Sequence, residues 1–518
     1  MIQNIKIGLT KDQHGWRRIL SQEGVPWEIA KIDENLKQYS TLILNSTLDS
    51  KKIKLINKYL KEGGAILTSA KGLKLLNKKQ KITPKFINKI KGNKFLFKNT
   101  GAIDIQSQGY LIQNANVGKI YLEKNKGILI AFPFDVNDLI LDKRSKKKFF
   151  PSPYRPLKEI VSLVSKGDLT RLVINSLQYL HIKRKIPYVH TWYYPKDYDN
   201  AFSFRVDVDT FLEKEMEPLL KFLKKEKLSL TWFVNVEAGK NHKKGIEKLK
   251  NAGQDIQSHA YKHIIYNTLE ENIKNIKKSN NFLKKIVKNP IGFCAPFGHW
   301  NENLGKALEK LNYAYSSDYS LDYDNLPFYP IVSDKETNVL QMPVYPTCIA
   351  LMIMRIYNKS MMKNYLSYLI EMQHKRQVPL FLYDHTNQGI AEYPEIFEHT
   401  IKEIKKYDNI WITTLTGFSQ WWKKRNVYYE AKLVNNKIKI NTKNEDKNIF
   451  IRVINPKYKE TRKILKNQKI SLNEGKKISS FKIKNISPLS ILFSQFMFKI
   501  HYSKILFKAI KKRIKERL

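Results

Sequence analysis

Between residues 201 and 424, short apolar runs alternate regularly with amphipathic segments of helical length. Three of these pairs are AFSFRVDV with EMEPLLKFLKKEK, LTWFVNV with KKGIEKLKNAG, and PLFLYDHT with EIFEHTIKEIKKYD. Repeated strand and helix units of this length predict parallel strands covered by helices, in a barrel or a doubly wound sheet. Polar residues gather where the strand segments end, and that edge of a barrel carries its active site. This alternation limits the fold more than any other feature of the chain.

The rest of the 518 residues is long enough to add one or two further domains. Residues 1–150 combine apolar runs such as STLILNS with the amphipathic KKIKLINKYLKEGG, which predicts an α/β unit. Residues 151–200 form a bridge that is rich in proline and aromatic residues. Residues 425–490 alternate apolar and polar positions, as the half-buried strands of a small antiparallel β domain do. A basic amphipathic tail helix is expected over residues 491–518.

The formal net charge of +46 allows nucleic acid, an anionic membrane surface or an acidic polymer as a partner. Lysine, isoleucine and asparagine are all abundant, so a general drift in composition also accounts for much of this charge. Since no RNA-binding or helix-turn-helix motif accompanies the lysines, nucleic acid is not expected as a partner.

The expected tail helix has one apolar face and is otherwise basic. Its apolar positions are Ile500, Phe507, Ile510, Ile514 and Leu518. Such a helix can lie on an anionic membrane surface, or it can dock on its own protein. Both alternatives stay open.

Two cysteines, Cys294 and Cys348, are too few for a disulfide framework or a four-thiolate zinc site, and they fit a reducing compartment. The first residues, MIQNIKIGLTKDQHGWRR, lack the pattern of a secretory signal, and no apolar run reaches about 18 residues. We therefore expect a cytoplasmic protein, peripheral at the inner face of the membrane if its tail binds there.

Two aspartates, Asp207 and Asp209, stand one residue apart at the end of an apolar strand segment. Alternate strand residues share a face, so the two carboxylates repel unless something positive lies between them. Two histidines, His259 and His263, follow another strand segment, and two imidazoles with one carboxylate are a usual catalytic zinc set. Ala260 stands where the metalloprotease motif requires glutamate, which argues against that class.

The segments VDVDT, SHAYKH, CAPFG, SSDYS and LYDHT resemble, in this order, the five motifs of the polysaccharide deacetylases, the NodB-homology family of carbohydrate esterases. The resemblance covers about residues 200–424. It implies a distorted (β/α) barrel that removes acetyl groups from N-acetylated sugars with a bound divalent metal, for which we expect zinc.

The resemblance also implies a role for each matching residue. The metal ligands would be Asp209, His259 and His263, and the general base would be Asp207. His385 would be the general acid, oriented by Asp318 or, as the weaker alternative, by Asp384. The backbone N–H of Phe297 would help to stabilise the oxyanion.

One departure from the family pattern concerns Cys294, which stands where an arginine usually positions the base. A cysteine cannot form a bidentate cationic clamp, so we expect Asp207 to be held differently or less well, with reduced or altered activity. Cys294 could instead be a nucleophile, but the sequence pairs it with no activating base.

The flanking regions carry weaker expectations. Residues 1–150 resemble the flavodoxin-like fold of class I glutamine amidotransferases, but Ser69 lies near the turn where that family has its cysteine, so we expect a scaffold or ligand-binding unit. In the bridge, the side chains that could stack on sugar rings or wedge two domains together are His190, Trp192, Tyr193 and Tyr194.

The function expected from these features is that of a metal-dependent hydrolase that deacetylates N-acetylated sugars of a surface polysaccharide or its precursor. The alternative is a carbohydrate-binding protein that is weakly active or inactive on the same scaffold.

Overall fold

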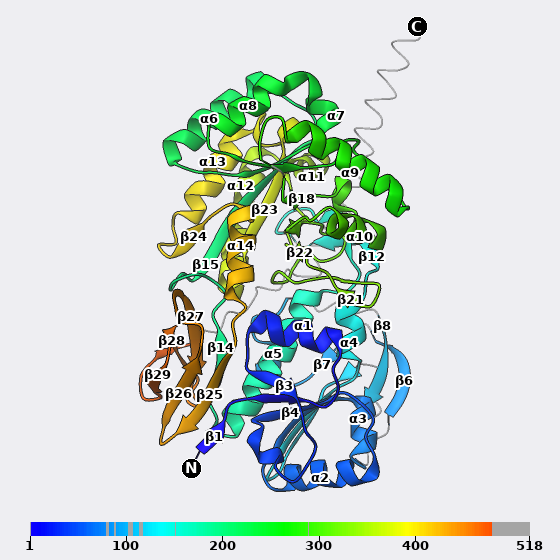
Figure 1. Cartoon of the computed structure of the whole chain (residues 1–518), viewed down its shortest axis with the longest axis vertical. Coiled ribbons are helices and arrows are strands. Elements are labelled where there is room, and N and C mark those ends of the chain that lie inside the picture. Colours follow the sequence, from blue (N-terminus) through cyan, green and yellow to red (C-terminus); the bar gives the residue numbers. More distant parts are fainter. Residues whose placement is uncertain are drawn as a thin grey trace.

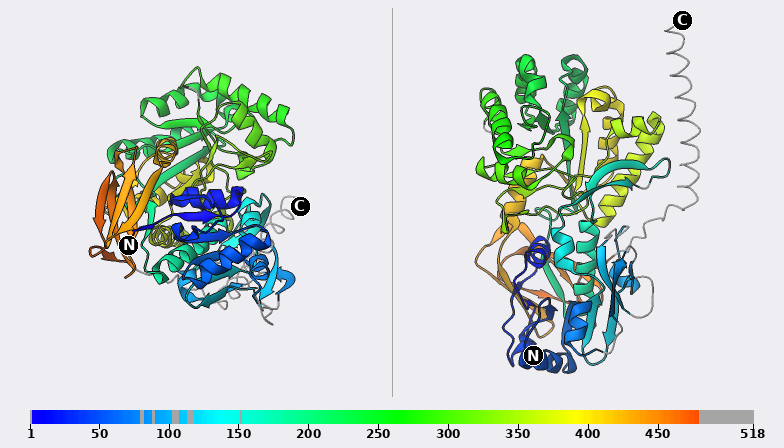
Figure 2. Two further views of the ribbon diagram at one scale, coloured as in Figure 1. Left: turned by 60° about the horizontal axis from the view of Figure 1, so that its bottom comes forward. Right: turned by 90° about the vertical axis from the view of Figure 1, so that its right-hand side faces the viewer.

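The structure is a computed structural model, which describes residues 2–478 except 79–81, 88–89, 102–106, 113–117, 151 and 289. The expected tail helix over residues 491–518 lies outside these residues, as do its apolar positions. No helix in the described part of the chain combines the length and the apolar character needed to cross a membrane. The chain forms an N-terminal α/β unit, a barrel and a pair of small sheets, arranged as Figures 1 and 2 show.

The N-terminal unit is built on a six-stranded sheet in which all neighbouring strands are parallel except the edge pair β10 and β11. In sheet order the strands are β10 (Tyr121–Lys124), β11 (Ile128–Phe132), β5 (Ala65–Ser69), β4 (Thr41–Leu44), β2 (Ile7–Leu9) and β3 (Trp27–Ile29). The central strands of this sheet are buried on both faces, so their sequences are continuous apolar runs and do not alternate between apolar and polar residues.

Helices cover both faces of this sheet and form a separate hydrophobic core on each side. One face packs against α1 (His14–Glu23), α4 (Val136–Leu141) and α5 (Lys166–Lys183). The other packs against α2 (Ser50–Lys61) and α3 (Ala70–Leu75). Asp49 caps α2 by accepting a hydrogen bond from the Lys52 amide. A hairpin is formed by β12 (Ser145–Phe150) with β13 (Leu157–Ser162), and β6 (Ile82–Ile87) pairs antiparallel with the more distant β8 (Ser107–Ile112).

The barrel is an eight-stranded sheet whose neighbouring strands are all parallel. It runs in the order β22 (Leu340–Gln341), β19 (Tyr315–Ser316), β18 (Gly292–Phe293), β17 (Asp255–Ser258), β16 (Thr231–Val234), β15 (Asn200–Val208) and β23 (Leu380–His385). The eighth strand, β24 (Ile410–Ile412), also pairs with β15. Every residue of β15 is buried, as expected for the central strand of a covered sheet. The distorted (β/α) barrel expected from the sequence is thus confirmed.

Helices follow these strands and lie around the sheet, as Figure 1 shows. They are α6 (Glu213–Glu226), α8 (Lys243–Asn251), α9 (Leu269–Leu283), α10 (Glu302–Lys310), α12 (Lys359–Arg376), α13 (Pro394–Ile404) and α14 (Leu415–Arg425). The connections that leave the C-terminal ends of β15, β17, β18 and β23 carry the motif residues. This is the end at which the barrel can hold a site.

The residues after 425 form two four-stranded sheets that also take strands from elsewhere in the chain. One sheet joins β25 (Tyr429–Val434), β26 (Lys437–Thr442) and β29 (Gln468–Ser471) to β1 (Ile2–Asn4). The other joins β27 (Asp446–Ile454), β28 (Lys459–Leu465) and β30 (Lys476–Lys477) to β14 (Tyr188–Thr191). The alternating pattern after residue 425 gives no sign of these two additional strands, because each of them is only three or four residues long.

The aromatic residues of the bridge are buried where these parts meet. His190, Trp192 and Tyr194 have no exposed surface, and the hydroxyl of Tyr193 donates a hydrogen bond to Glu23 of α1. Arg425, at the end of α14, donates to the main-chain oxygens of Glu23, Thr191 and Trp192. Of the two alternatives for these aromatic side chains, the structure therefore favours the wedge between domains over a sugar-stacking surface.

Candidate metal centre

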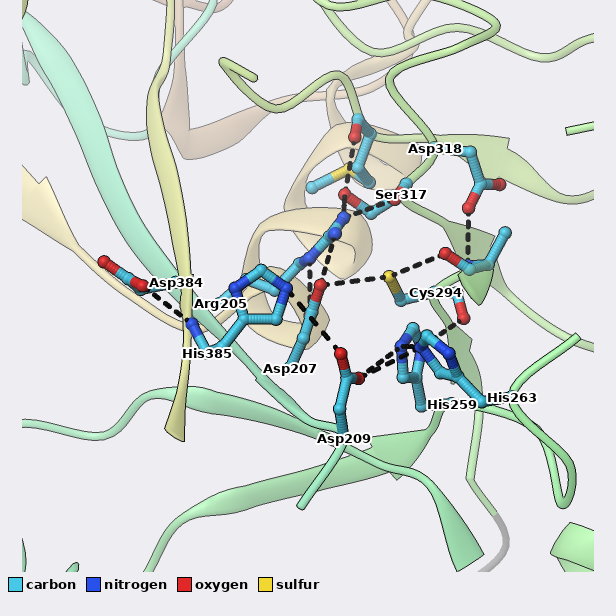
Figure 3. Close-up of polar contacts among 12 residues, drawn as sticks. Arg205, Asp207, Asp209, His259, His263, Cys294, Ser317, Asp318, Asp384 and His385 are labelled. Atoms are coloured by element: carbon cyan, nitrogen blue, oxygen red, sulfur yellow. Dashed lines mark hydrogen bonds and ion pairs between the residues drawn. The ribbon is translucent and has the colours of Figure 1, made fainter. Parts of the chain in front are cut away.

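Strand β15 brings three charged side chains to one face of the barrel sheet. Arg205 and Asp207 lie on the strand and Asp209 follows its last residue, so all three point the same way. Arg205 and Asp207 are almost fully buried, whereas the side chain of Asp209 is 31% exposed. Asp209 is thus the carboxylate that solvent and a ligand can reach, and Figure 3 shows it beside His259 and His263.

Asp209 meets both histidines of the SHAYKH segment. Its Oδ1 atom is 3.1 Å from Nε2 of His259 and 3.1 Å from Nε2 of His263. The two Nε2 atoms are also 3.1 Å apart. Ligand atoms around one tetrahedral zinc with bonds of 2.0–2.1 Å lie about 3.3 Å from one another, so the three atoms are spaced as a zinc site requires.

The imidazole of His259 has its tautomer fixed by the main chain. Its Nδ1 atom lies 2.7 Å from the carbonyl oxygen of Cys294, which can only accept, so Nδ1 carries the proton and donates. The lone pair of Nε2 is then directed toward Asp209 and His263. Histidines that bind a metal through one ring nitrogen are commonly oriented by a hydrogen bond from the other ring nitrogen to a carbonyl or carboxylate.

His263 is positioned by its loop. Ala260 adopts a left-handed backbone (φ 64°), which turns the chain back after β17. Asn275 of α9 then holds both neighbours of His263: it accepts from the Lys262 amide at 2.8 Å and donates to the carbonyls of Lys262 and Ile264, both at 3.1 Å. Asn275 could not be selected from the sequence, since a helical asparagine that faces a loop has no local signature.

Within the described residues, three groups of side chains could hold a metal ion. One is the group of Asp209, His259 and His263, and in the other two the carboxylate is already engaged by hydrogen bonds from the protein. In the group of Asp207, His259 and Cys294, both oxygens of Asp207 accept from Arg205. In the group of Cys348, Asp384 and His385, both oxygens of Asp384 accept main-chain N–H bonds. By contrast, Oδ1 of Asp209 is buried and faces the two imidazoles, with no hydrogen bond from any other described residue. The Asp209 group therefore fits a divalent cation best.

The electrostatics agree with this assignment. Burial alone would raise the pKa of Asp209, but the neighbouring His259 and His263 lower it well below its usual range. Asp209 is thus ionised at neutral pH and ready to bind a cation.

Asp207 is held by a bidentate arginine clamp, although Cys294 stands where the family usually has its arginine. Nε and Nη2 of Arg205 donate to the two oxygens of Asp207 at 2.8 and 2.7 Å. Arg205 also donates to the carbonyl and hydroxyl of Ser317, and its guanidinium lies 4.9 Å from the ring centre of Tyr383. Of the two expectations for Asp207, the structure thus shows that it is held differently, by an arginine of its own strand rather than by residue 294. The overlooked signal was an arginine two residues before the aspartate, on the same face of one strand.

Cys294 packs beside this clamp. Its Sγ atom is 3.8 Å from Oδ2 of Asp207, and the residue is fully buried. Burial raises the pKa of the Cys294 thiol far above its usual value, so the thiol stays protonated. A nucleophilic role is therefore disfavoured.

His385 lies at the end of β23, directly beside Asp207 in the register of the sheet. Its Nε2 atom is 3.8 Å from Oδ2 of Asp209, and burial lowers the pKa of its imidazole. Its Nδ1 atom is buried and has no hydrogen-bond partner in the part of the chain that the structure describes.

Neither of the two candidate carboxylates, Asp318 and Asp384, forms a hydrogen bond with the ring of His385. Asp318 accepts from the Ala295 amide at 2.7 Å and from the hydroxyl of Ser316, and burial raises its pKa to about 6. Asp384 accepts from the main-chain amides of His385 and Ile349, and burial raises its pKa to about 8. The contact expected between Asp318 and His385 is thus not formed, and Asp318 instead supports the segment after β18.

Phe297 lies on the open side of the histidine pair. Its backbone is left-handed (φ 57°), its side chain is 73% exposed, and its ring centre is 4.7 Å from that of His263. Of the residues selected from the sequence, Asp207, Asp209, His259, His263 and His385 are therefore gathered at one end of the barrel (Figure 3). Phe297 joins them through its ring contact with His263.

Comparisons with solved structures return proteins that align with somewhat under half of this chain. A protein from Mycobacterium smegmatis, itself only provisionally assigned as a polysaccharide deacetylase, is 15% identical, with 46% of this chain and 95% of that chain covered and a TM-score of 0.40. An allantoinase is 17% identical, with 44% and 91% covered and a TM-score of 0.38. A CE4 family pseudoenzyme from Bacillus anthracis is 13% identical, with 44% and 68% covered and a TM-score of 0.31.

A search of curated proteins gives no significant match. The polysaccharide deacetylase family model, however, matches residues 205–316. This segment begins at Arg205 and contains both the aspartate pair and the histidine pair. Residues 205–316 of the barrel therefore form a polysaccharide deacetylase domain.

Proposed function

We propose that the protein is a metal-dependent hydrolase that removes acetyl groups from the N-acetylated sugars of a surface polysaccharide or its precursor. The observation that carries the proposal is the 3.1 Å convergence of Asp209, His259 and His263 beside a buried, arginine-clamped Asp207. Ligands for a cation and a carboxylate base are the two components that metal-assisted amide hydrolysis needs.

In this proposal Asp209, His259 and His263 hold a divalent cation, for which zinc fits the two imidazoles and one carboxylate. The cation, when bound, supplies a Lewis acid that polarises the acetamide carbonyl and acidifies water. It also relieves the repulsion between the carboxylates of Asp207 and Asp209.

The proton transfers belong to the protein side chains. Asp207 accepts the proton of the attacking water, and the clamp of Arg205 keeps its carboxylate ionised and oriented. His385 gives a proton to the departing amine; the burial that lowers its pKa makes its protonated form a stronger acid. The main-chain N–H of Phe297 donates to the oxygen that gains negative charge in the transition state.

The first experiment measures the metal content of the purified protein beside its His263→Ala variant. One divalent ion per chain is expected in the original protein, with most of it lost in the variant. His242→Ala is the matched control, since His242 lies beside Glu213, outside the group of ligands, and its loss should leave the metal in place. An equal metal content in the original protein and the His263→Ala variant would refute the assigned ligands.

The second experiment measures acetate release from N-acetylated oligosaccharides. Asp207→Asn should abolish release while it retains the metal, because the amide is nearly the same size but cannot take up a proton. An unchanged rate in this variant would exclude Asp207 as the base.

The alternative is a carbohydrate-binding protein with weak or no activity. Its support is the absence of a hydrogen bond to Nδ1 of His385 from the described residues, which leaves the proposed acid without an orienting carboxylate. Glycan binding with a full complement of metal, but without release of acetate, would favour it over the hydrolase.

A further inference from the structure

A second site lies between the N-terminal unit, the barrel and the sheet of β27 and β28. It is a cavity of about 390 Å³, lined by α5, by the segment around Lys98, by the turn after α12 and by strands β27, β28 and β30. Small-molecule sites commonly begin at about 300 Å³, so this volume suits a small ligand.

The cavity is remote from the metal centre. On the barrel it is lined by Asp199 and Val378, which precede strands β15 and β23, whereas Asp209 and His385 stand at the ends of those strands. At about 3.3 Å per residue, the nine residues of β15 separate the two ends by roughly 26 Å. A ligand in this cavity would therefore bind outside the proposed active site.

Helix α5 presents a row of polar side chains to the cavity. Helix α5 is buried almost throughout, yet its residues at helical spacing on the cavity side include Thr170, Arg171, Asn175 and Gln178. Figure 1 shows α5 in the middle of the molecule, between the N-terminal sheet and the barrel. A helix in this position would be expected to carry apolar residues on such a face, as it does on the others.

Several polar atoms that line the cavity lack partners within the described residues. They are Oγ1 of Thr170, Nε of Arg171 and Nδ1 of His374, and Thr170 is only 5% exposed. The side chain of Arg171 makes neither an ion pair nor a hydrogen bond in the described part of the chain. Burial lowers the pKa of its guanidinium, although Tyr193, Asp168 and Glu23 lie near enough to oppose this effect. A desolvated guanidinium without a partner is costly unless an anion binds to it.

The acidic residues around the cavity already form ion pairs or hydrogen bonds with other residues of the protein. Asp199 and Glu460 pair with Arg462, and Glu460 also pairs with Arg452. Asp324 accepts from the amides of Gly167 and Asp168, and burial raises its pKa to about 8. Glu23 accepts from two tyrosine hydroxyls. Among the residues that the structure describes, the charges around the cavity without an acidic partner are therefore basic: Lys98, Arg171, Lys476 and Lys477.

We propose that this cavity binds a phosphorylated small molecule, with a phosphate group on Arg171 and the lysines around it. A planar guanidinium matches the oxygens of a phosphate group, and lysines supply further charge without a fixed geometry. The lining comes from all three parts of the chain, so the bound ligand would tie them together.

The test uses inorganic pyrophosphate as the probe, with calorimetric titration and thermal unfolding of the full chain. Pyrophosphate should bind and raise the unfolding temperature, and Arg171→Met should weaken binding at least tenfold. Without pyrophosphate this variant should be as stable as the original protein, because it removes a half-buried charge that has no ion-pair partner among the described residues. Lys476→Gln, a change at an exposed residue, should weaken binding several-fold.

Two controls separate this cavity from other sites. The His263→Ala variant, which lacks a ligand of the metal centre, should bind pyrophosphate as the original protein does. Arg17→Gln, at a surface ion pair with Asp12, should also leave binding unchanged. Binding that is equal in the original protein and in Arg171→Met, or that is lost with His263, would overturn the inference, as would no binding at millimolar pyrophosphate.

Discussion

Arg205 replaces, from a different strand, the arginine that the CAPFG segment lacks. It reaches Asp207 from two positions earlier on β15, and Cys294 fills the space on the other side of the carboxylate. Both residues of the clamp are buried, so the ion pair is little screened by solvent. Arg205 is thus a positioning residue for the proposed base.

Arg205→Met should lower kcat of deacetylation by about 100-fold, since Asp207 would lose both its charge partner and its orientation. The KM and the bound metal should change little, because Arg205 touches neither the metal ligands nor the open side of the site. Arg205→Lys should recover part of the rate, as it keeps the charge without the bidentate geometry. A fall in kcat that is matched by loss of metal would assign Arg205 a purely structural role.

Cys294→Ala tests the nucleophile alternative directly. With a thiol whose pKa is raised far above its usual value by burial, the variant should keep activity within a few-fold. The small cavity left by the sulfur should cost about 1 kcal/mol of stability. Complete loss of acetate release in a folded, metal-loaded variant would revive a catalytic role for the thiol.

Part of the site was predictable at this scale because its residues form local patterns. Asp207 and Asp209 share a strand face, and His259 and His263 lie four residues apart, so both pairs are visible in the sequence. Whether a carboxylate orients the ring of His385 was not predictable, because this depends on the side-chain conformation of a buried aspartate. Asp318 turns to the Ala295 amide instead.

At the scale of elements, α9 serves the site although it contributes no ligand. Asn275 fixes the main chain on both sides of His263 through three hydrogen bonds. Asn272, one turn earlier, holds the next part of the same loop by bonding the amide and carbonyl of Tyr266. The position of the second imidazole therefore depends on a helix that the motif does not include.

Asn275→Ala should lower the affinity for zinc by about 10- to 100-fold, the range typical of residues that orient metal ligands. Zinc titration against a competing chelator measures this, with Asn281→Ala as the control on an exposed position of the same helix. An affinity equal to that of the control would show that the loop holds His263 without Asn275.

The elements themselves were predictable to different degrees. The barrel helices are long and follow apolar strand segments at regular intervals, and this alternation identified the fold class even though strands such as β18 and β19 are short. Strands β1 and β14 were not identified, because they acquire their strand character only by pairing with β25 and β27. Such pairing is a tertiary effect, which local propensity does not contain.

At the scale of the whole molecule, two buried histidines make stability depend on pH. Burial lowers the pKa of His181 in α5 and of His190 in β14 to about 4. Their neighbours include Arg184 for His181, and Glu23, Arg425 and Arg452 for His190. In the unfolded chain both titrate near pH 6.5.

The unfolded state therefore binds protons first as the pH falls. The stability that depends on the neutral histidines is complete above about pH 6.5, is lost as the pH falls toward 4, and then levels off. Each histidine should contribute a loss on the order of 2 kcal/mol at pH 5. Chemical denaturation at pH 7.5, 6 and 5 measures this loss. His190→Asn should show a shallower decline than the original protein, and an identical decline would contradict the assignment.

The pairing of β1 with β25 also has a consequence for how the chain folds. Ile2 pairs with Val434, so this contact joins residues 432 positions apart, the difference between the two residue numbers. At synthesis rates of about 5–20 residues per second, the first strand waits on the order of tens of seconds for its partner to leave the ribosome. Closing so long a loop is a late and slow event, which contact order places after the local folding of the barrel. The pairing of β25 with β1 would then be one of the last steps of folding. A nascent chain that stops before β25 would hold a folded barrel while β1 remains unpaired.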